Sequence, residues 1–126
     1  MEQDRVQNVY YYVDARSNKP IVEFIESLSF DDQTKVLAYI RGLRSQGNNL
    51  RRPMADYLGN DIYELRPKDN RIFCFFYLKN NVVLVHAIKK KTKKIPPSDL
   101  ALCLKRKQEI ESEYGHHLEK LELRGD

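Results

Sequence analysis

The chain has 126 residues, of which 41% are hydrophobic and 32% are charged, and it carries a net charge of +4. These values predict one soluble domain with a core of modest size, and no apolar stretch approaches the roughly 20 residues that cross a bilayer. The two cysteines, Cys74 and Cys103, lack the spacing of a metal-binding or redox pair, so we expect both to fill the core of a cytoplasmic protein that uses no cofactor.

The first half of the chain predicts a strand and then a helical hairpin. The aromatic and β-branched run at 9–13 is typical of a strand, and Pro20 suits the first turn of a helix, where a missing N–H costs nothing. Ser29, with Asp32 three residues later, resembles the start of a second helix, and Gly47 supplies its end. The first helix repeats apolar residues at i, i+3, i+4 and i+7: Ile21, Phe24, Ile25 and Leu28.

The second half predicts a loop at 48–60, three strands and a last helix. The strands are expected at 62–66, 71–78 and 82–90, because the residues between them are turn formers. A helix follows the prolines at 96 and 97 and ends at Gly115. We therefore expect a single domain over residues 1–115, followed by an acidic tail, 116–126, that is a candidate for mobility.

Two turn signals set a register that gathers cations at one end of the sheet. A four-residue loop at 67–70 pairs Arg66 with Arg71, and a two-residue turn at 80–81, where asparagine tolerates positive φ, pairs Arg71 with Lys90. Alternation then places all three cations on one face, and a slip of one residue would reverse the faces. The opposite face, expected to pack on the helices, collects Tyr63, Leu65, Ile72, Cys74, Phe76, Val83, Val85 and Ala87.

The distribution of charge favours a polyanionic partner. Residues 1–40 carry a net charge of −3, residues 41–108 carry +11 and residues 109–126 carry −4. A solvated lysine surface gives the same count, but like charges opposed in a sheet cost up to about 1 kcal/mol per pair, and a bound phosphate would relieve that cost. Further cations that could bind nucleic-acid phosphates flank this end of the sheet or lie in the loop before it: Lys89, Lys91, Lys93, Lys94, Arg51 and Arg52.

Such a site suits the cleavage of an RNA phosphodiester. The nucleophile is the substrate's own 2′-hydroxyl, so the protein supplies positioning, electrostatics and proton transfer, and no metal is required. Arginine binds two phosphate oxygens at once, and a lysine crowded by cations gives up its proton more readily, which suits Lys90 to act as acid or base. His86, alone in an apolar strand, is expected to be a hydrogen-bonded core residue.

These segments resemble the RelE/HigB superfamily of toxins, in its phage-derived HigB-like branch. The resemblance rests on Tyr-Glu-Leu-Arg at 63–66, Arg71 opening the next strand, His-Ala-Ile at 86–88, and the basic segment 90–96. It implies an α+β, RelE-like fold: a small antiparallel sheet of about four strands, mixed at the first strand, packed against an N-terminal helical hairpin and a C-terminal helix.

The resemblance also implies a function. It makes the chain a toxin of a type II toxin–antitoxin system, a ribosome-dependent endoribonuclease that cuts mRNA and is neutralised by a helix-turn-helix antitoxin. It assigns catalytic or RNA-binding roles to Arg66, Arg71, Lys90 and Lys91, with Lys94 beside them. Two other functions stay open: a non-catalytic nucleic-acid-binding protein, and a gyrase inhibitor of a sister branch. The oligomeric state stays open as well.

Overall fold

The computed structural model describes residues 8–47, 54–78, 80–89, 94–113 and 117–123. Within these ranges the chain forms three helices and one mixed six-stranded sheet with the strand order β2-β3-β4-β5-β1-β6. The elements are β1 (Asn8–Tyr12), α1 (Pro20–Glu26), α2 (Phe30–Gln46), β2 (Ala55–Gly59), β3 (Ile62–Leu65), β4 (Asn70–Tyr77), β5 (Asn81–Lys89), α3 (Pro97–Glu113) and β6 (Leu118–Lys120).

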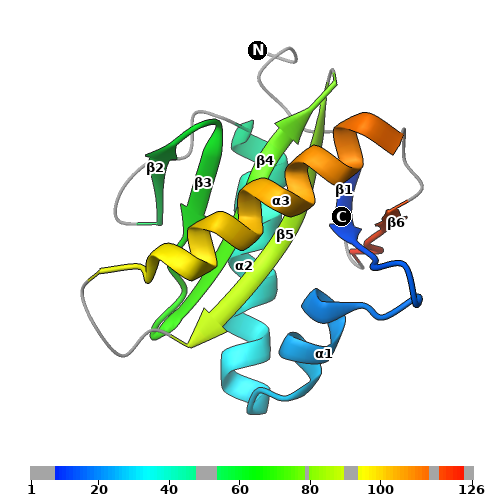
Figure 1. The fold of residues 1–126 in the computed structure, drawn as a ribbon. Helices are drawn as coiled ribbons and strands as arrows, with labels where there is room; N and C mark the ends of the chain where they lie inside the picture. Colours follow the sequence, from blue (N-terminus) through cyan, green and yellow to red (C-terminus); the bar gives the residue numbers. More distant parts are fainter. Residues whose placement is uncertain (1–7, 48–53, 79, 90–93, 114–116, 124–126) are drawn as a thin grey trace.

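The expected α+β architecture is confirmed, including the mixed sheet. β1 runs parallel to β5, and the other neighbouring strands are antiparallel. Figure 1 shows α3 crossing one face of the sheet, while α1 and α2 lie against the other face. Across the described residues, no helix combines the length and the apolar character needed to cross a lipid bilayer.

The sheet has more strands than the expected four or so. β2 lies in the stretch predicted as a loop, and β6 lies in the predicted tail, where it pairs with the edge of β1. Neither segment is rich in β-branched or aromatic residues, so pairing with an existing strand, rather than local propensity, forms these two edges.

The predicted helix signals are present at the residues named for them. Pro20 occupies the first turn of α1. The side chain of Ser29 caps α2 by accepting a hydrogen bond from the backbone N–H of Asp32 at 3.2 Å. Gly47 follows α2 with φ 58°, a left-handed conformation that glycine adopts without a steric penalty.

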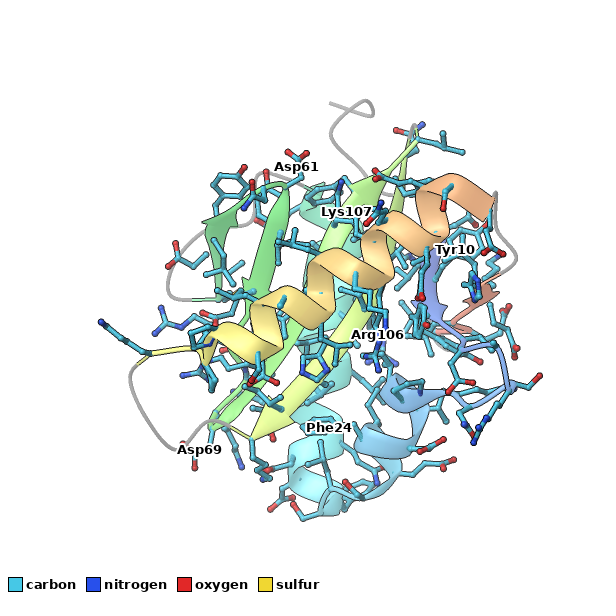
Figure 2. The ribbon with its side chains drawn as sticks, viewed as in Figure 1. Tyr10, Phe24, Asp61, Asp69, Arg106 and Lys107 are labelled. Carbon is cyan, nitrogen blue, oxygen red and sulfur yellow. The ribbon has the colours of Figure 1, made fainter. Side chains whose placement is uncertain are left out.

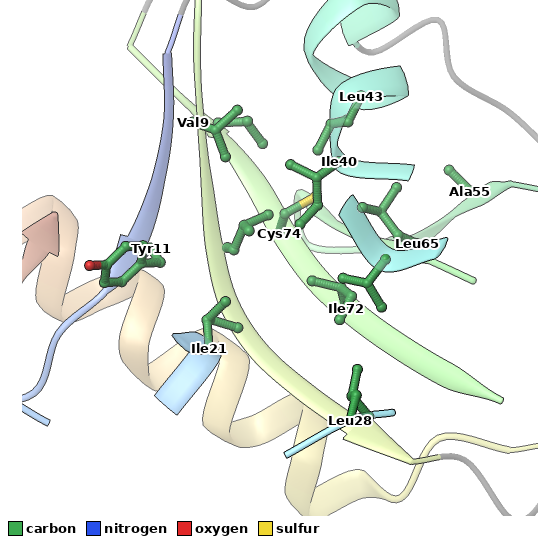
Figure 3. Packing of buried hydrophobic residues seen from close by; sticks show 13 residues of the cluster. Val9, Tyr11, Ile21, Leu28, Ile40, Leu43, Ala55, Leu65, Ile72 and Cys74 are labelled. Carbon is green, nitrogen blue, oxygen red and sulfur yellow. The ribbon is translucent and has the colours of Figure 1, made fainter. Parts of the chain in front are cut away.

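Each face of the sheet has its own apolar core. Figure 3 shows the core between the sheet and the α1/α2 pair, which includes Leu65, Ile72 and Cys74 as predicted. The core under α3 contains these buried residues: Tyr12, Ile62, Phe73, Phe75, Val83, Val85, Cys103 and Ile110. Burial raises the pKa of both cysteine thiols, Cys74 and Cys103, to about 12, which fits the expected role of inert core residues.

The predicted register is confirmed in the first hairpin and wrong in the second. Glu64 pairs with Phe73 as expected, but Arg71 pairs with Ile88 instead of Lys90. The expected two-residue turn is replaced by a connection between Tyr77, the end of β4, and Asn81, the start of β5. The flanking residues of this connection, Leu78 and Asn80, have φ of 54° and 66°.

The new register exchanges the faces of residues 82–85 in β5. Val82 and Leu84 belong to the core under α1 and α2, whereas Val83 and Val85 belong to the core under α3. A β-bulge opposite Phe73 and Cys74 then restores the expected faces for the end of the strand. Consequently His86 and Ile88 lie on the α3 face, as the sequence predicted.

Candidate nucleic-acid interface

Two arginines flank the turn between β3 and β4. Arg66 follows the end of β3, and Arg71 is the second residue of β4. The confirmed pairing of Glu64 with Phe73 places both arginines on the face that α3 covers, since alternate residues share a face. Figure 2 labels Asp69 of this turn at the end of the sheet where β5 also ends.

Arg71 keeps its positive charge unneutralised by carboxylates. Its Nη1 donates hydrogen bonds to the backbone carbonyls of Lys68 at 2.8 Å and Asn70 at 2.7 Å. Among the described residues, no carboxylate lies within ion-pair distance of the guanidinium, and its buried Nε has no hydrogen-bond partner. The carbonyls therefore hold the guanidinium in place and leave a net charge that an anion can match.

Arg66 differs from Arg71 because a buried carboxylate lies beside it. Nε of Arg66 is 3.7 Å from Oε1 of Glu64, which is within ion-pair range but too long for a hydrogen bond. The Glu64 side chain is only 4% exposed, whereas that of Arg66 is 31% exposed. Glu64 thus offsets part of the charge of Arg66, and the two arginines with this carboxylate carry one net positive charge.

The structure describes only some of the predicted cations outside the arginine pair. Lys90, Lys91, Lys93, Arg51 and Arg52 lie outside the described residues. The predicted pairing of Lys90 with Arg71 is wrong, because the second hairpin places Ile88 opposite Arg71. Lys94 is exposed, shortly before α3 begins.

Lys89 is described, and it binds the carboxylate of Asp32 instead of joining the arginines. Its Nζ lies 3.1 Å from Oδ2 of Asp32, and Nζ of Lys68 lies 3.2 Å from Oδ1. The side-chain amide of Asn70 also donates to Asp32, at 3.3 Å. These hydrogen bonds lower the pKa of Asp32. The bond from Lys89 contributes most, followed by those from Asn70 and Lys68.

His86 pairs with a carboxylate that the sequence did not predict. Nε2 of His86 is 2.7 Å from Oδ1 of Asp99, in the first turn of α3, and the ring stacks on Phe73. The sequence predicted a hydrogen-bonded histidine, but the partner Asp99 was missed. No periodic pattern could reveal it, because the contact joins a bulged strand to a helix across the intervening basic segment.

Arg106 was missed as well. From the middle of α3 its Nη1 donates to the carbonyl oxygen of Val85 at 2.7 Å, and its guanidinium lies 4.7 Å from the ring centre of Tyr12. Figure 2 labels Arg106 on the side of α3 that faces β5 and β1. Burial, together with a 2.7 Å hydrogen bond to Glu109, raises the pKa of Tyr12 to about 12. Among the described residues, no group of histidine, cysteine or carboxylate side chains is arranged to hold a metal ion.

The end of the sheet that carries Arg66 and Arg71 is called the cationic end below. The fold and this cationic end define a small α+β protein with a candidate anion site between β3, β4 and α3. Residues 23–108 match the family model described as "Phage derived protein Gp49-like (DUF891)". The match spans more than half of the chain, so the protein belongs to this Gp49-like family, which is associated with toxin–antitoxin systems. A search of curated proteins gives no match. The narrower resemblance to the RelE/HigB superfamily stays a prediction.

Proposed function

We propose that the chain is the toxin of a type II toxin–antitoxin pair and acts as a metal-independent endoribonuclease on mRNA at the ribosome. The observation that carries the proposal is the position of Arg71 on the α3 face, in a chain whose family is associated with toxin–antitoxin systems. Its charge has no carboxylate partner among the described residues, so it is available to pair with a phosphate.

The proposed reaction assigns the cations to the substrate phosphate. Arg71 and Arg66 bind the non-bridging oxygens and stabilise the charge that develops on them as the 2′-oxygen attacks. Lys90 and Lys91 act with them as catalytic cations. Backbone phosphates of the RNA bind the remaining predicted cations: Lys89, Lys93, Lys94, Arg51 and Arg52.

Partners follow from the same proposal. The net charge of +11 over residues 41–108 favours binding to ribosomal RNA as well as to mRNA. A helix-turn-helix antitoxin neutralises the toxin, and we expect its gene to lie next to the toxin's gene. An antitoxin that neutralises the toxin by covering the cationic end would compete with RNA for it.

Arg71→Ala tests the proposal directly. The variant is expected to lose growth arrest on induction and to lower mRNA cleavage in a translation extract by at least about 100-fold, which is the scale for a lost transition-state contact. Arg16→Ala is the matched control, because Arg16 is an exposed arginine in the turn before α1. It should behave like the wild-type protein.

Other outcomes assign the chain to another class. Growth arrest and mRNA cleavage that both survive Arg71→Ala would refute the catalytic role of the cationic end. RNA binding without cleavage by the wild-type protein would indicate a non-catalytic nucleic-acid-binding protein. Loss of DNA supercoiling with purified gyrase, before any effect on translation, would indicate a gyrase inhibitor.

A further inference from the structure

The His86–Asp99 pair lies on the same sheet face as the two arginines. His86 is opposite Phe73, and Arg71 is opposite Ile88, so His86 and Arg71 are diagonal neighbours across β4 and β5. Diagonal neighbours of an antiparallel pair lie roughly 7–8 Å apart, within reach of long side chains. A phosphate bound by Arg71 would therefore sit close to the imidazole.

The bulge in β5 turns His86 toward this face. Val83 and Val85 both lie in the core under α3, so strict alternation would place His86 on the opposite face. The bulge adds one residue to β5, and Val85 and His86 consequently share the α3 face. At the bulge, Nη1 of Arg106 donates a hydrogen bond to the carbonyl oxygen of Val85. Bulges commonly re-aim a side chain beside an active site.

The hydrogen bond to Asp99 sets the proton on the imidazole. A carboxylate only accepts hydrogen bonds, so Nε2 of His86 carries the hydrogen, and in the neutral form of the ring Nδ1 presents a lone pair. Among the described residues, Nδ1 has no hydrogen-bond partner. The Asp99 carboxylate, whose side chain is 22% exposed, would stabilise the imidazolium that forms when Nδ1 takes up a proton. The pair therefore has the arrangement of a general base with its positioning residue.

We propose that His86 is the general base of the RNA-cleaving site and that Asp99 is its positioning residue; this inference rests on the function proposed above. Nδ1 takes the proton of the ribose 2′-hydroxyl while the 2′-oxygen forms a bond to phosphorus. The bond between phosphorus and the 5′-oxygen breaks, and that oxygen takes a proton from water. The hydroxide left behind takes the proton from the His86 imidazolium, which restores the base. The products are a 2′,3′-cyclic phosphate and a 5′-hydroxyl, and nothing is oxidised or reduced.

Single-turnover cleavage of a labelled mRNA in a translation extract tests the assignment, with thermal unfolding as the check on folding. His86→Gln is expected to lower the cleavage rate by about 10²–10⁴-fold, the usual contribution of a general base. His86→Ala with added imidazole should regain at least about tenfold, which a purely structural histidine would not permit. Asp99→Asn, which leaves Nε2 without its carboxylate, should lower the rate at least about tenfold.

The results separate this inference from the function on which it rests. Suppose that a folded His86→Gln variant cleaves within about threefold of the wild-type rate while Arg71→Ala is inactive. This result would refute His86 as the general base and would still support the endoribonuclease activity. If His86→Gln does not fold, a folded Asp99→Asn variant with the wild-type rate overturns the inference in the same way. If the wild-type protein leaves the mRNA intact, the proposed endoribonuclease function is refuted, and so is the proposed role of His86.

Discussion

Lys68 and Lys89 differ from Arg71 in how their charges are balanced. Both lysines bind the carboxylate of Asp32, at 3.2 Å and 3.1 Å, on the side of the sheet that faces α2. Arg71, on the α3 side, binds only backbone carbonyls among its described contacts. Asp32 therefore offsets one of the two lysine charges on the α2 side, and each face keeps one net positive charge at this end of the sheet. The faces differ because both lysines contact a carboxylate, whereas Arg71 has none within ion-pair distance among the described residues.

The lowered pKa of Asp32 predicts an acid-dependent loss of stability. A carboxyl whose pKa is lower in the folded state stabilises the fold above its unfolded pKa, here 3.8, and this contribution is lost as the pH falls through the folded value. Asp32→Asn should therefore lower the urea midpoint at pH 7 relative to the wild-type protein. The difference should shrink as the pH falls below about 3.8.

Asp31→Asn is the control, because Asp31 is exposed in the same first turn of α2 and shares its helix dipole. It should change the midpoint less than Asp32→Asn does at pH 7. Equal effects of the two substitutions at every pH would show that the contacts with Lys68 and Lys89 contribute nothing to stability.

β5 shows why a pattern of alternation alone could not predict the site. Turn-forming asparagines indicated a hairpin, and the hairpin exists, but its actual register differs from the predicted one. The bulge at Val85 then returned the end of the strand to the predicted face. Alternation carries no signal for either shift. The register change accompanies the connection between Tyr77 and Asn81, and the bulge lies where Arg106 of α3 binds the carbonyl of Val85.

Arg106→Ala tests how much the contacts of Arg106 at the bulge contribute to stability. The substitution leaves the carbonyl of Val85 without its charged donor and removes the contact with the ring of Tyr12. We expect the free energy of unfolding to fall by about 2 kcal/mol, as for a lost hydrogen bond to a charged group. Chemical denaturation of Lys105→Ala, an exposed neighbour on α3, is the control. A loss below about 0.5 kcal/mol would contradict the role given to Arg106.

At the scale of the whole molecule, the sequence pattern predicted the central strands, the helical hairpin and the last helix, and the family resemblance implied that the first strand makes the sheet mixed. Apolar periodicity and helix caps act locally, so they can be read from a single chain. β6 could not be predicted, because its partner β1 lies at the other end of the chain. β2 was missed although its partner is the neighbouring strand β3, because the residues of β2 have little strand propensity of their own. The placement of Arg66 and Arg71 on one face followed from a correct first hairpin, whereas Asp99 and Arg106 required the tertiary packing.

The most direct measurement identifies the ends of mRNA fragments formed when the purified protein is added to a translating extract. The account predicts new fragments with 2′,3′-cyclic phosphate and 5′-hydroxyl ends, formed by the wild-type protein and absent with Arg71→Ala. Intact mRNA at protein concentrations that stop translation would contradict the account, and so would fragments ending in a 3′-hydroxyl and a 5′-phosphate.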